Sequence, residues 1–416
     1  MDFKKARGFQ DFFEEDCLKF DNTLSELFKI LKRFDFSRVE PPLLEDTNLF
    51  KRTLGSESDI VSKEMYSLQK GKENFTLRPE GTASIARMLV TQNNYRQLPL
   101  RWFYYGPMFR HERPQKGRFR QFHQLGIESL GDSQTETDVE ILSMAWLIVK
   151  KFNLKSHVFL EINSLGKKEE RDQYKKQFQK YLFPFKNKLS KDSQIRLNKN
   201  PLRIWDSKEE EDQDILKKAP LLIENLDSSS LQRYSEIKNL LKDLKIPFKE
   251  KPQLVRGLDY YNDLVFEWTS SQLGSQSALI AGGRYDTLVE QLGGIQTPAV
   301  GWALGLERLN LLCPAVKKPT LQIALISSGE GTQKAYKLAY QLRSEGYSVY
   351  YRFSGNFSKQ MKRASSKCLW FLIYGQKEQK QESIILKNLK TKKQVSLALS
   401  DLSQELNKRL NSLDTC

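Results

Sequence analysis

The 416-residue sequence predicts an α+β domain built on an antiparallel sheet, interrupted by a helical insertion and followed by a small α/β domain. Two strand patterns joined by a Pro/Gly loop occur within residues 101–130 and predict an antiparallel hairpin. Residues from about 165 to 250 are rich in lysine, glutamine and glutamate and poor in glycine, which indicates a mostly helical insertion. Strand and helix patterns then alternate after residue 320. We therefore place one domain at residues 1–316 and a second at 317–416.

The first domain opens on apolar residues at helical spacing. An amphipathic helix that ends near Phe36 is predicted by Leu18, Leu24, Leu27, Phe28 and Leu31. Glu40-Pro41-Pro42 then forces an extended turn, because a proline biases the preceding residue out of the helical region. A second helix is expected from about Thr135 to Lys151. Glycine-rich signals return between Arg256 and Gly305, so the insertion interrupts a single domain.

The second domain is expected to follow a linker at Pro314 and Lys317-Lys318-Pro319. Its predicted strands are Leu321–Ser327, Ser348–Phe353 and Leu369–Tyr374. Its predicted helices are Thr332–Ser344 and Ser358–Ser366. Alternation of this kind favours a largely parallel sheet.

The net charge of +16 is unevenly distributed. Residues 317–416 contain 18 lysines and arginines against 7 aspartates and glutamates, a net charge of +11. This asymmetry indicates a polyanionic partner, since lysine and arginine displace counterions from phosphates. A basic surface that serves only solubility is the alternative.

Cysteine and histidine usage argues against zinc chemistry. The four cysteines lie far apart and form no CxxC pair: Cys17, Cys313, Cys368 and Cys416. The only histidines are His111, His123 and His157. We therefore expect no zinc, and chemistry that rests on carboxylates, arginines and tyrosines. No apolar run approaches the roughly 18 residues of a membrane span, and the N-terminus lacks a secretory apolar core, so we expect a cytoplasmic protein without membrane contact.

The predicted hairpin concentrates charged residues on one face. Period-two geometry places Arg110 and Glu112 together on the first strand. On the second strand it places together Arg118, Arg120, Gln124, Gly126 and Glu128. Arginines clustered with two acids around a glycine suit a charged, nitrogen-rich substrate and a phosphate. A salt-bridged hairpin facing solvent is the alternative.

Five segments carry a resemblance to a known family. The run Phe109–Arg118 resembles motif 2 of class II aminoacyl-tRNA synthetases in its histidyl version. Four further segments are similar to that family in the same order: Leu77–Thr82 to its amino-acid-binding strand and turn, Leu254–Tyr261 and Gly282–Asp286 to its two histidine-specific motifs, and Gly301–Leu309 to motif 3. Phe9 and Trp302 stand where smaller residues are commoner.

The resemblance implies a class II synthetase catalytic domain and a C-terminal anticodon-binding domain. The implied enzyme activates histidine with ATP, expected with Mg²⁺, and then esterifies histidine to the 3′ end of tRNA(His). A homodimer is also implied, because Glu40-Pro41-Pro42 lies where the family has its dimer-forming motif 1.

The resemblance also implies roles for individual residues. Arg256 and Arg110 are the implied catalytic residues. The implied ATP-binding residues are Arg110, Glu112, Arg118 and Arg308. The implied histidine-binding residues are Glu80, Thr82, Gln124, Glu128, Tyr260, Tyr261 and Tyr285. The implied contacts to the tRNA acceptor end are Arg113, Gln115 and Lys116. No metal ligand is assigned.

Several of these residues also have a physical case of their own. A preorganised guanidinium at Arg256 could stabilise the charge that develops on phosphoryl oxygens, a contribution of a few kcal/mol. Arg308 lies near the start of an expected helix, where anions are favoured, although a salt bridge with Glu307 is the alternative. For Tyr260 and Tyr261, core packing is the alternative to binding imidazole.

The candidate anticodon-binding residues of the second domain are basic and aromatic. The basic candidates are Arg343, Arg352, Lys359, Lys362 and Arg363. Unpaired bases are read by stacking, so the aromatic candidates are Tyr350, Tyr351 and Phe353, with ordinary strand positions as the alternative.

Two other functions compete with the ligase. A synthetase-like, histidine-sensing regulatory subunit of ATP phosphoribosyltransferase would resemble the catalytic domain, but such proteins typically lack the anticodon domain and the intact arginine motif. Another class II synthetase, such as a prolyl or threonyl enzyme, would share motifs 2 and 3 but not Arg256–Tyr261 together with Gly282–Asp286.

Overall fold

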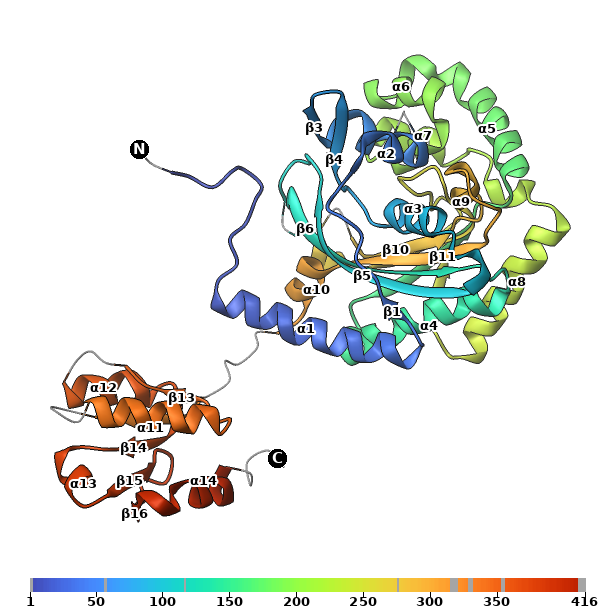
Figure 1. Cartoon of the computed structure of the whole chain (residues 1–416). Coiled ribbons are helices and arrows are strands. Elements are labelled where there is room, and N and C mark those ends of the chain that lie inside the picture. The colour runs from blue at the N-terminus through green and yellow to red at the C-terminus, as the bar shows by residue number, and fades with distance from the viewer. Residues whose placement is uncertain are drawn as a thin grey trace. The chain divides into compact units, whose positions relative to one another are not determined.

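The structure is a computed structural model that describes residues 3–55, 58–115, 117–274, 277–314, 321–327, 332–352 and 356–410. The chain divides into two compact units, Met1–Val316 and Lys317–Cys416 (Figure 1). The expected linker residues Lys317–Pro319 lie outside the described residues. No helix in the described part of the chain is long and apolar enough to cross a membrane.

An eight-stranded, mostly antiparallel sheet forms the centre of the first unit. Its strand order is β1-β5-β6-β11-β10-β9-β7-β8. The strands are β1 (Ser37–Arg38), β5 (Leu100–Phe109), β6 (Gln121–Leu130), β7 (Phe159–Ser164), β8 (Phe248–Glu250), β9 (Asn262–Thr269), β10 (Ala278–Arg284) and β11 (Ala299–Gly305). Only the pairings of β1 with β5 and of β7 with β8 are parallel in this sheet. The predicted antiparallel sheet is confirmed.

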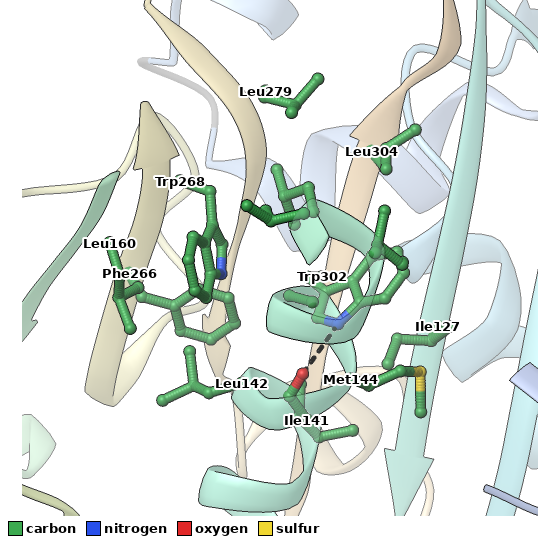
Figure 2. Packing of buried hydrophobic residues seen from close by; sticks show 14 of the residues in the cluster. Ile127, Ile141, Leu142, Met144, Leu160, Phe266, Trp268, Leu279, Trp302 and Leu304 are labelled. Atoms are coloured by element: carbon green, nitrogen blue, oxygen red, sulfur yellow. Dashed lines mark hydrogen bonds between the residues drawn. The ribbon is translucent and has the colours of Figure 1, made fainter. Parts of the chain in front are cut away.

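One face of the sheet is covered by α1 (Glu14–Arg33), α4 (Thr135–Lys151) and α8 (Ser228–Asp243) (Figure 1). Figure 2 shows the tryptophans of this core, where Trp302 Nε1 donates a hydrogen bond of 3.2 Å to the Ile141 carbonyl oxygen of α4. The indole is 2% exposed, so its bulk fills the layer between sheet and helix. Trp302 is therefore a packing residue on the helix-covered face.

Helix α1 ends at Arg33, three residues before the predicted end near Phe36. Asp35 adopts a left-handed conformation with φ of 59°, which stops the helix and turns Phe36 into the core. Helix α4 has the predicted bounds. Acidic residues begin it and lysines end it, as the helix dipole favours.

The opposite face of the large sheet carries further elements. They include α3 (Thr82–Gln92), η2 (Asn94–Gln97) and α9 (Leu288–Gln291), whereas η6 (Ser271–Leu273) and α10 (Leu306–Leu312) pack into the core on the side of α1 and α4. Residues 44–77 form a small antiparallel sheet of order β2-β4-β3. Its strands are β2 (Leu44–Asp46), β3 (Tyr66–Lys70) and β4 (Glu73–Leu77), and α2 (Thr47–Leu54) and the π-helical turn η1 (Ile60–Glu64) lie between β2 and β3 in the sequence.

The insertion is helical, as predicted. It contains α5 (Lys168–Leu182), η3 (Phe183–Lys188), α6 (Lys191–Lys199), η4 (Pro201–Asp206), α7 (Glu210–Leu216) and η5 (Leu222–Asn225). Its last helix, α8, packs against α4, and β8 pairs with β7 at the edge of the large sheet. The final part of the insertion therefore completes the core of the first unit.

The second unit is an α/β domain with sheet order β13-β12-β14-β15-β16. Its elements are β12 (Leu321–Ile326), α11 (Thr332–Ser344), β13 (Val349–Tyr350), α12 (Phe357–Ser365), β14 (Cys368–Ile373), α13 (Gln376–Lys380), β15 (Ser383–Asn388), β16 (Gln394–Ala398), η8 (Leu399–Asp401) and α14 (Leu402–Leu410). The expectation of a largely parallel sheet is wrong. Strands β13, β12 and β14 are parallel, but β15 and β16 add an antiparallel hairpin, because a short turn at 389–393 allows only antiparallel pairing.

Candidate active site

A cavity of about 820 Å³ opens between the large sheet, the hairpin loop and the insertion. Its volume lies within the range of roughly 300–1,000 Å³ typical of small-molecule sites. Ten of the implied site residues line it: Glu80, Thr82, Arg110, Glu112, Arg118, Gln124, Arg256, Tyr260, Tyr261 and Arg308. Four stretches of the sequence, 80–82, 110–124, 256–261 and the one at Arg308, therefore meet at one place.

The hairpin loop supplies the first group of charges. Strand β5 ends at Phe109 and strand β6 begins at Gln121. Residues 110–120 therefore form a longer connection than the predicted Pro/Gly loop. Arg110 Nε donates a hydrogen bond of 2.8 Å to the Pro79 carbonyl oxygen. The buried carboxylate of Glu112 pairs closely with Arg118 and lies 3.8 Å from Arg110. These contacts preorganise two guanidinium groups on the cavity wall.

Arg120 does not join this group, so the predicted common face is wrong at this position. Arg120 hydrogen-bonds the carbonyl oxygens of Arg7 and Glu112, and it does not line the cavity. The physical reason is that strand β6 begins only at Gln121. Strict alternation therefore does not extend back through Arg118 and Arg120.

Buried polar groups occupy the inner end of the cavity. The Glu80 carboxylate accepts hydrogen bonds from the backbone N–H groups of Thr82 (2.7 Å) and Ala83 (2.8 Å) at the start of α3. Thr82 Oγ1 donates to Glu128 at 2.7 Å, and the Tyr285 hydroxyl donates to the other carboxylate oxygen. Glu128 and Tyr285 lie behind this wall and are almost fully buried.

Burial changes the acid–base properties of both carboxyl groups. Desolvation raises the pKa of Glu128 to about 8, although Tyr285 and Thr82 donate hydrogen bonds to its carboxylate. Desolvation also raises the pKa of Glu80, against the two backbone N–H groups that stabilise its charged form. The inner end of the cavity is therefore a place where a nitrogen base and a carboxyl group could share a proton.

Gln124 presents an available acceptor to the cavity. Its Oε1 is buried and makes no hydrogen bond within the described residues. The clustered face of the predicted hairpin suggested that Gly126 leaves room for a ligand, but it does not. A Cβ atom at Gly126 would lie 2.2 Å from Cζ of the buried Tyr104 ring, and one at Gly81 would lie equally close. The two glycines therefore make room for Tyr104, which sequence reasoning did not single out.

Arg256 lies on an irregular segment between β8 and β9. Its guanidinium pairs with Glu267 of β9 and lies 5.6 Å from the centre of the Tyr261 ring. Tyr260 and Tyr261 pack together with ring centres 4.6 Å apart, and Tyr260 also contacts Tyr285. Tyr260 and Tyr261 are packed in the core and also line the cavity, so imidazole binding by either stays a prediction.

Helix α10 brings Arg308 to the cavity. Arg308 Nη1 donates to the Ala278 carbonyl oxygen at 2.5 Å, so its guanidinium is not paired with Glu307. Glu307 instead accepts hydrogen bonds from the backbone N–H of His123 (2.9 Å) and from its ring at Nδ1 (2.8 Å). These bonds fasten α10 to strand β6.

Strand β10 is fixed by a buried ion cluster behind Tyr285. Arg284 donates to one oxygen of Asp138 at 2.9 and 2.6 Å, and the two side chains are 1% and 0% exposed. Arg233 of α8 pairs with Asp138 and, at 2.9 Å, with Asp263. Helices α4 and α8 are thereby tied to strand β10, which ends just before Tyr285.

Sequence reasoning missed several residues on the cavity wall. They are Glu64, Arg196, Arg203, Trp205, Asp206, Lys208 and Glu267. A charged residue within the apolar run Leu264–Trp268 of β9 was a usable signal for Glu267. No local signal marked the insertion residues, because only the tertiary fold brings η4 to the cavity. No group of three or more His, Cys, Asp or Glu side chains in the described ranges could hold a metal ion.

Among the implied tRNA contacts, Arg113 and Gln115 do not line the cavity. Arg113 and Gln115 are exposed on the hairpin loop, and Lys116 lies outside the described residues. In the second unit, Tyr351 is buried and its hydroxyl lies 2.9 Å from Ser327 Oγ, so it is a core residue. Tyr350 lies beside two cations, with Arg352 5.1 Å and Lys367 5.6 Å from its ring centre. Phe353 lies outside the described residues.

Known proteins resemble both units. The family model for histidyl-tRNA synthetase matches residues 8–309, and that for the anticodon binding domain matches residues 321–409. The chain is 40% identical to a histidine–tRNA ligase of Gluconobacter oxydans over 403 residues, which is 96% of this chain and 97% of the relative. It is 45% identical to one of Prochlorococcus marinus over 368 residues, which is 87% and 86%.

Solved structures extend the comparison. The S. aureus histidyl-tRNA synthetase aligns with a TM-score of 0.81 and 31% identity, covering 97% of this chain and 99% of the other. A Bacillus halodurans protein described as an ATP phosphoribosyltransferase regulatory subunit/histidyl-tRNA synthetase aligns with a TM-score of 0.65 at 21% identity, covering 90% and 98%, which shows a shared fold only. Two family models and near full-length relatives of about 40% identity thus agree, and the chain belongs to the histidyl-tRNA synthetase family.

Proposed function

We propose that the cavity is where histidine and ATP react to form histidyl-adenylate and pyrophosphate, before histidine is transferred to the 3′ end of tRNA(His). Histidine–tRNA ligation itself follows from membership of the family. The observation that carries the residue-level proposal is the composition of the cavity lining. Three arginines, Arg110, Arg256 and Arg308, share it with Glu80 and the available acceptor of Gln124.

The inner end of the cavity suits histidine. The Gln124 Oε1 atom and the Glu80 carboxylate would accept hydrogen bonds from the α-ammonium group, with Thr82 beside them. Glu128 would meet one imidazole nitrogen, with Tyr260 or Tyr261 near the other and Tyr285 supporting Glu128 from behind. A pocket that hydrogen-bonds its substrate strongly rejects analogues that leave buried polar groups unpaired.

The arginines suit the nucleotide. Arg110 would contact the α-phosphate, Arg308 a phosphate farther along, and the Glu112–Arg118 pair the adenine end. When the histidine carboxylate attacks the α-phosphorus, negative charge grows on the phosphoryl oxygens and pyrophosphate leaves. Arg256 would stabilise that charge, which is worth a few kcal/mol, or roughly a hundredfold in rate.

Magnesium would accompany ATP. Mg²⁺ usually binds through substrate phosphates and one or two protein carboxylates. Glu267 and Glu112 on the cavity wall are carboxylates of suitable chemistry, so the donor set fits this mode of binding. The ion would neutralise phosphate charge when bound. We propose no zinc for this site.

The tRNA would meet the chain at two places. Arg113, Gln115 and Lys116 of the hairpin loop are the proposed acceptor-end contacts. The anticodon would bind the second unit, where the net charge of +11 supports phosphate contacts and the half-buried Tyr350 beside Arg352 offers a surface for base stacking. Further cations on this unit are Arg343, Lys359, Lys362 and Arg363.

We also propose a cytoplasmic homodimer. The exposed side chains of Leu43, Leu44 and Leu68 support it, because they follow or neighbour the segment at Glu40-Pro41-Pro42 that is similar to motif 1. Apolar patches of this kind are common at protein interfaces. Sedimentation at working concentration tests the proposal, and a monomer would refute it.

Histidine-dependent ATP–pyrophosphate exchange tests the catalytic proposal. The wild-type protein should exchange pyrophosphate only with histidine, and a pure preparation that binds both ligands without exchange would refute it. Arg256→Ala should lower the exchange rate by roughly a hundredfold and change the histidine Kd little. Equal losses in rate and histidine binding would refute the proposed role of Arg256.

A further inference from the structure

The segment that carries Arg256, Tyr260 and Tyr261 lacks main-chain support. In the part of the chain that the structure describes, residues 255–261 form a turn at Asp259–Tyr260 but make no main-chain hydrogen bond to another element. Buried backbone groups need partners, and an irregular segment without them keeps one conformation only if side chains hold it. The position of Arg256 therefore depends on contacts from outside this segment.

The insertion supplies those contacts at three points. Arg203 of η4 donates a hydrogen bond of 2.8 Å from Nη1 to the Gly257 carbonyl oxygen. Asn200, just before η4, donates one of 2.8 Å from Nδ2 to the Asp259 carboxylate. Arg171 of α5 donates to the Tyr261 carbonyl oxygen. The three side chains thus bind the segment near its catalytic arginine, at its middle and at its second tyrosine.

Arg203 is itself held in place. Its Nη2 lies 3.2 Å from the Asp59 carboxylate, and its Nε lies 3.0 Å from Asp206. The side chain is only 16% exposed, so these ion pairs are partly shielded from solvent. Gly257 permits the close approach, because a Cβ atom there would lie 3.3 Å from Nη1 of Arg203. The guanidinium is therefore a fixed point against which the Gly257 carbonyl is set.

We propose that Arg203 and Arg171 are positioning residues for adenylate formation, acting through the segment 254–261. Arg203 fixes the carbonyl group of Gly257, the residue that directly follows Arg256, and so controls where the catalytic guanidinium lies. Arg171 sets the Tyr261 carbonyl, and so controls the tyrosine end that borders the histidine subsite. The proposal rests on the proposed function of the cavity and assigns the insertion a part in the chemical step.

The two contacts predict separate kinetic effects. Arg203→Ala should lower the rate of histidine-dependent ATP–pyrophosphate exchange by roughly ten- to a hundredfold, with the histidine Kd changed less than about threefold, since a misplacement of about 1 Å can cost that much in rate. Arg171→Ala should chiefly raise the histidine Kd, by roughly tenfold. Arg203→Lys keeps the charge and should recover part of the lost rate.

The matched control is Lys175→Ala, which removes a surface pair with Asp172 (3.6 Å) on the same helix as Arg171. This variant should match the wild type in rate, Kd and Tm. The Tm of each variant is measured alongside. If an alanine variant does not fold, Arg203→Lys and Arg171→Lys provide the same comparison with smaller effects.

The outcomes separate this proposal from the one on which it rests. A wild-type protein without histidine-dependent exchange would refute the proposed function. An active wild type with Arg203 variants that keep the full rate would refute the positioning role alone. The positioning role would also be refuted if the rate, the histidine affinity and the Tm all fell together in both arginine variants. That pattern would indicate only a structural contact. A rate loss confined to Arg203 and a binding loss confined to Arg171 support the proposal.

Discussion

The carboxylate of Glu267 pairs with the guanidinium of Arg256 on the wall of the cavity, and the two side chains are 19% and 16% exposed. A shielded carboxylate both attracts the arginine and fixes its direction. Glu267→Ala should therefore lower the rate of adenylate formation at least tenfold, or about 1.4 kcal/mol. Glu267→Gln, which keeps an oxygen acceptor, should lose less. Single-turnover kinetics measure both, and a faster alanine variant would show that Glu267 restrains Arg256.

The pKa of Glu128 predicts how histidine binding depends on pH. Its raised value of about 8 lies above that of imidazole, about 6.5. Between about pH 6.5 and pH 8, free Glu128 is protonated and the free ring is neutral. A complex in which the two share one proton then forms in this range without uptake or release of a proton. Above about pH 8 the complex must take up a proton, so the affinity should fall about tenfold per pH unit.

Glu128→Gln isolates this effect, because an amide can hydrogen-bond the ring without titrating. The ratio of the wild-type Kd to the variant Kd cancels the titration of the histidine α-amino group. Calorimetry between about pH 6 and 9.5 should give a ratio that is constant up to about pH 8 and rises beyond it. A ratio that does not vary with pH would exclude Glu128 as the partner of the ring.

Gly126 and Tyr104 predict a stability effect at the inner end of the cavity. A methyl group at Gly126 would lie 2.2 Å from the Tyr104 ring, so Gly126→Ala should lower the free energy of unfolding by about 1–3 kcal/mol. Tyr104→Leu in the same chain should relieve part of this loss, and a double-mutant cycle in urea measures the coupling. Strict additivity of the two changes would contradict the packing argument.

The buried ion cluster predicts a larger effect. Asp138→Asn leaves Arg284 without its full counter-charge at a site that is about 1% exposed, so it should lower the free energy of unfolding by about 3–5 kcal/mol. Glu26→Gln is the control, because Glu26 pairs with the exposed side chains of Lys29 and Lys151 and should change stability by under about 1 kcal/mol. Similar losses for both variants would contradict this distinction.

The charge of the second unit predicts the response to salt. If residues 317–416 bind tRNA through phosphates, the tRNA affinity should fall steeply, and linearly on a double-logarithmic plot, as KCl is raised. The histidine Kd, governed by a shielded cavity, should change much less. Filter binding and calorimetry on the same preparation measure the two slopes, and equal slopes would argue against phosphate contacts.

The fold was predictable where the signal was local. Helix α4 has its predicted bounds because acidic and lysine residues mark its ends, whereas α1 ends early at the left-handed Asp35, which periodicity does not reveal. The hairpin β15–β16 was missed because its lysines mask the alternation of buried Ile384 and Leu386.

The residues of the candidate site were also predictable only where a local sequence signal marks them. The segments around Arg110 and Arg256 stand out in the sequence and meet at the cavity. Arg203 and Asp59 could not be found there, because their meeting depends on how the insertion folds back over residues distant in the chain.

The bonds from Glu307 to His123 have a mechanical consequence. Gln124 and Arg308 directly follow these two residues, so the proposed histidine and nucleotide ends of the cavity are borne by one rigid frame of β6 and α10. The spacing between the two substrates is then set before either arrives. Adjustment during the reaction falls to residues 255–261 of the cavity lining, where side chains of the insertion contact Gly257, Asp259 and Tyr261.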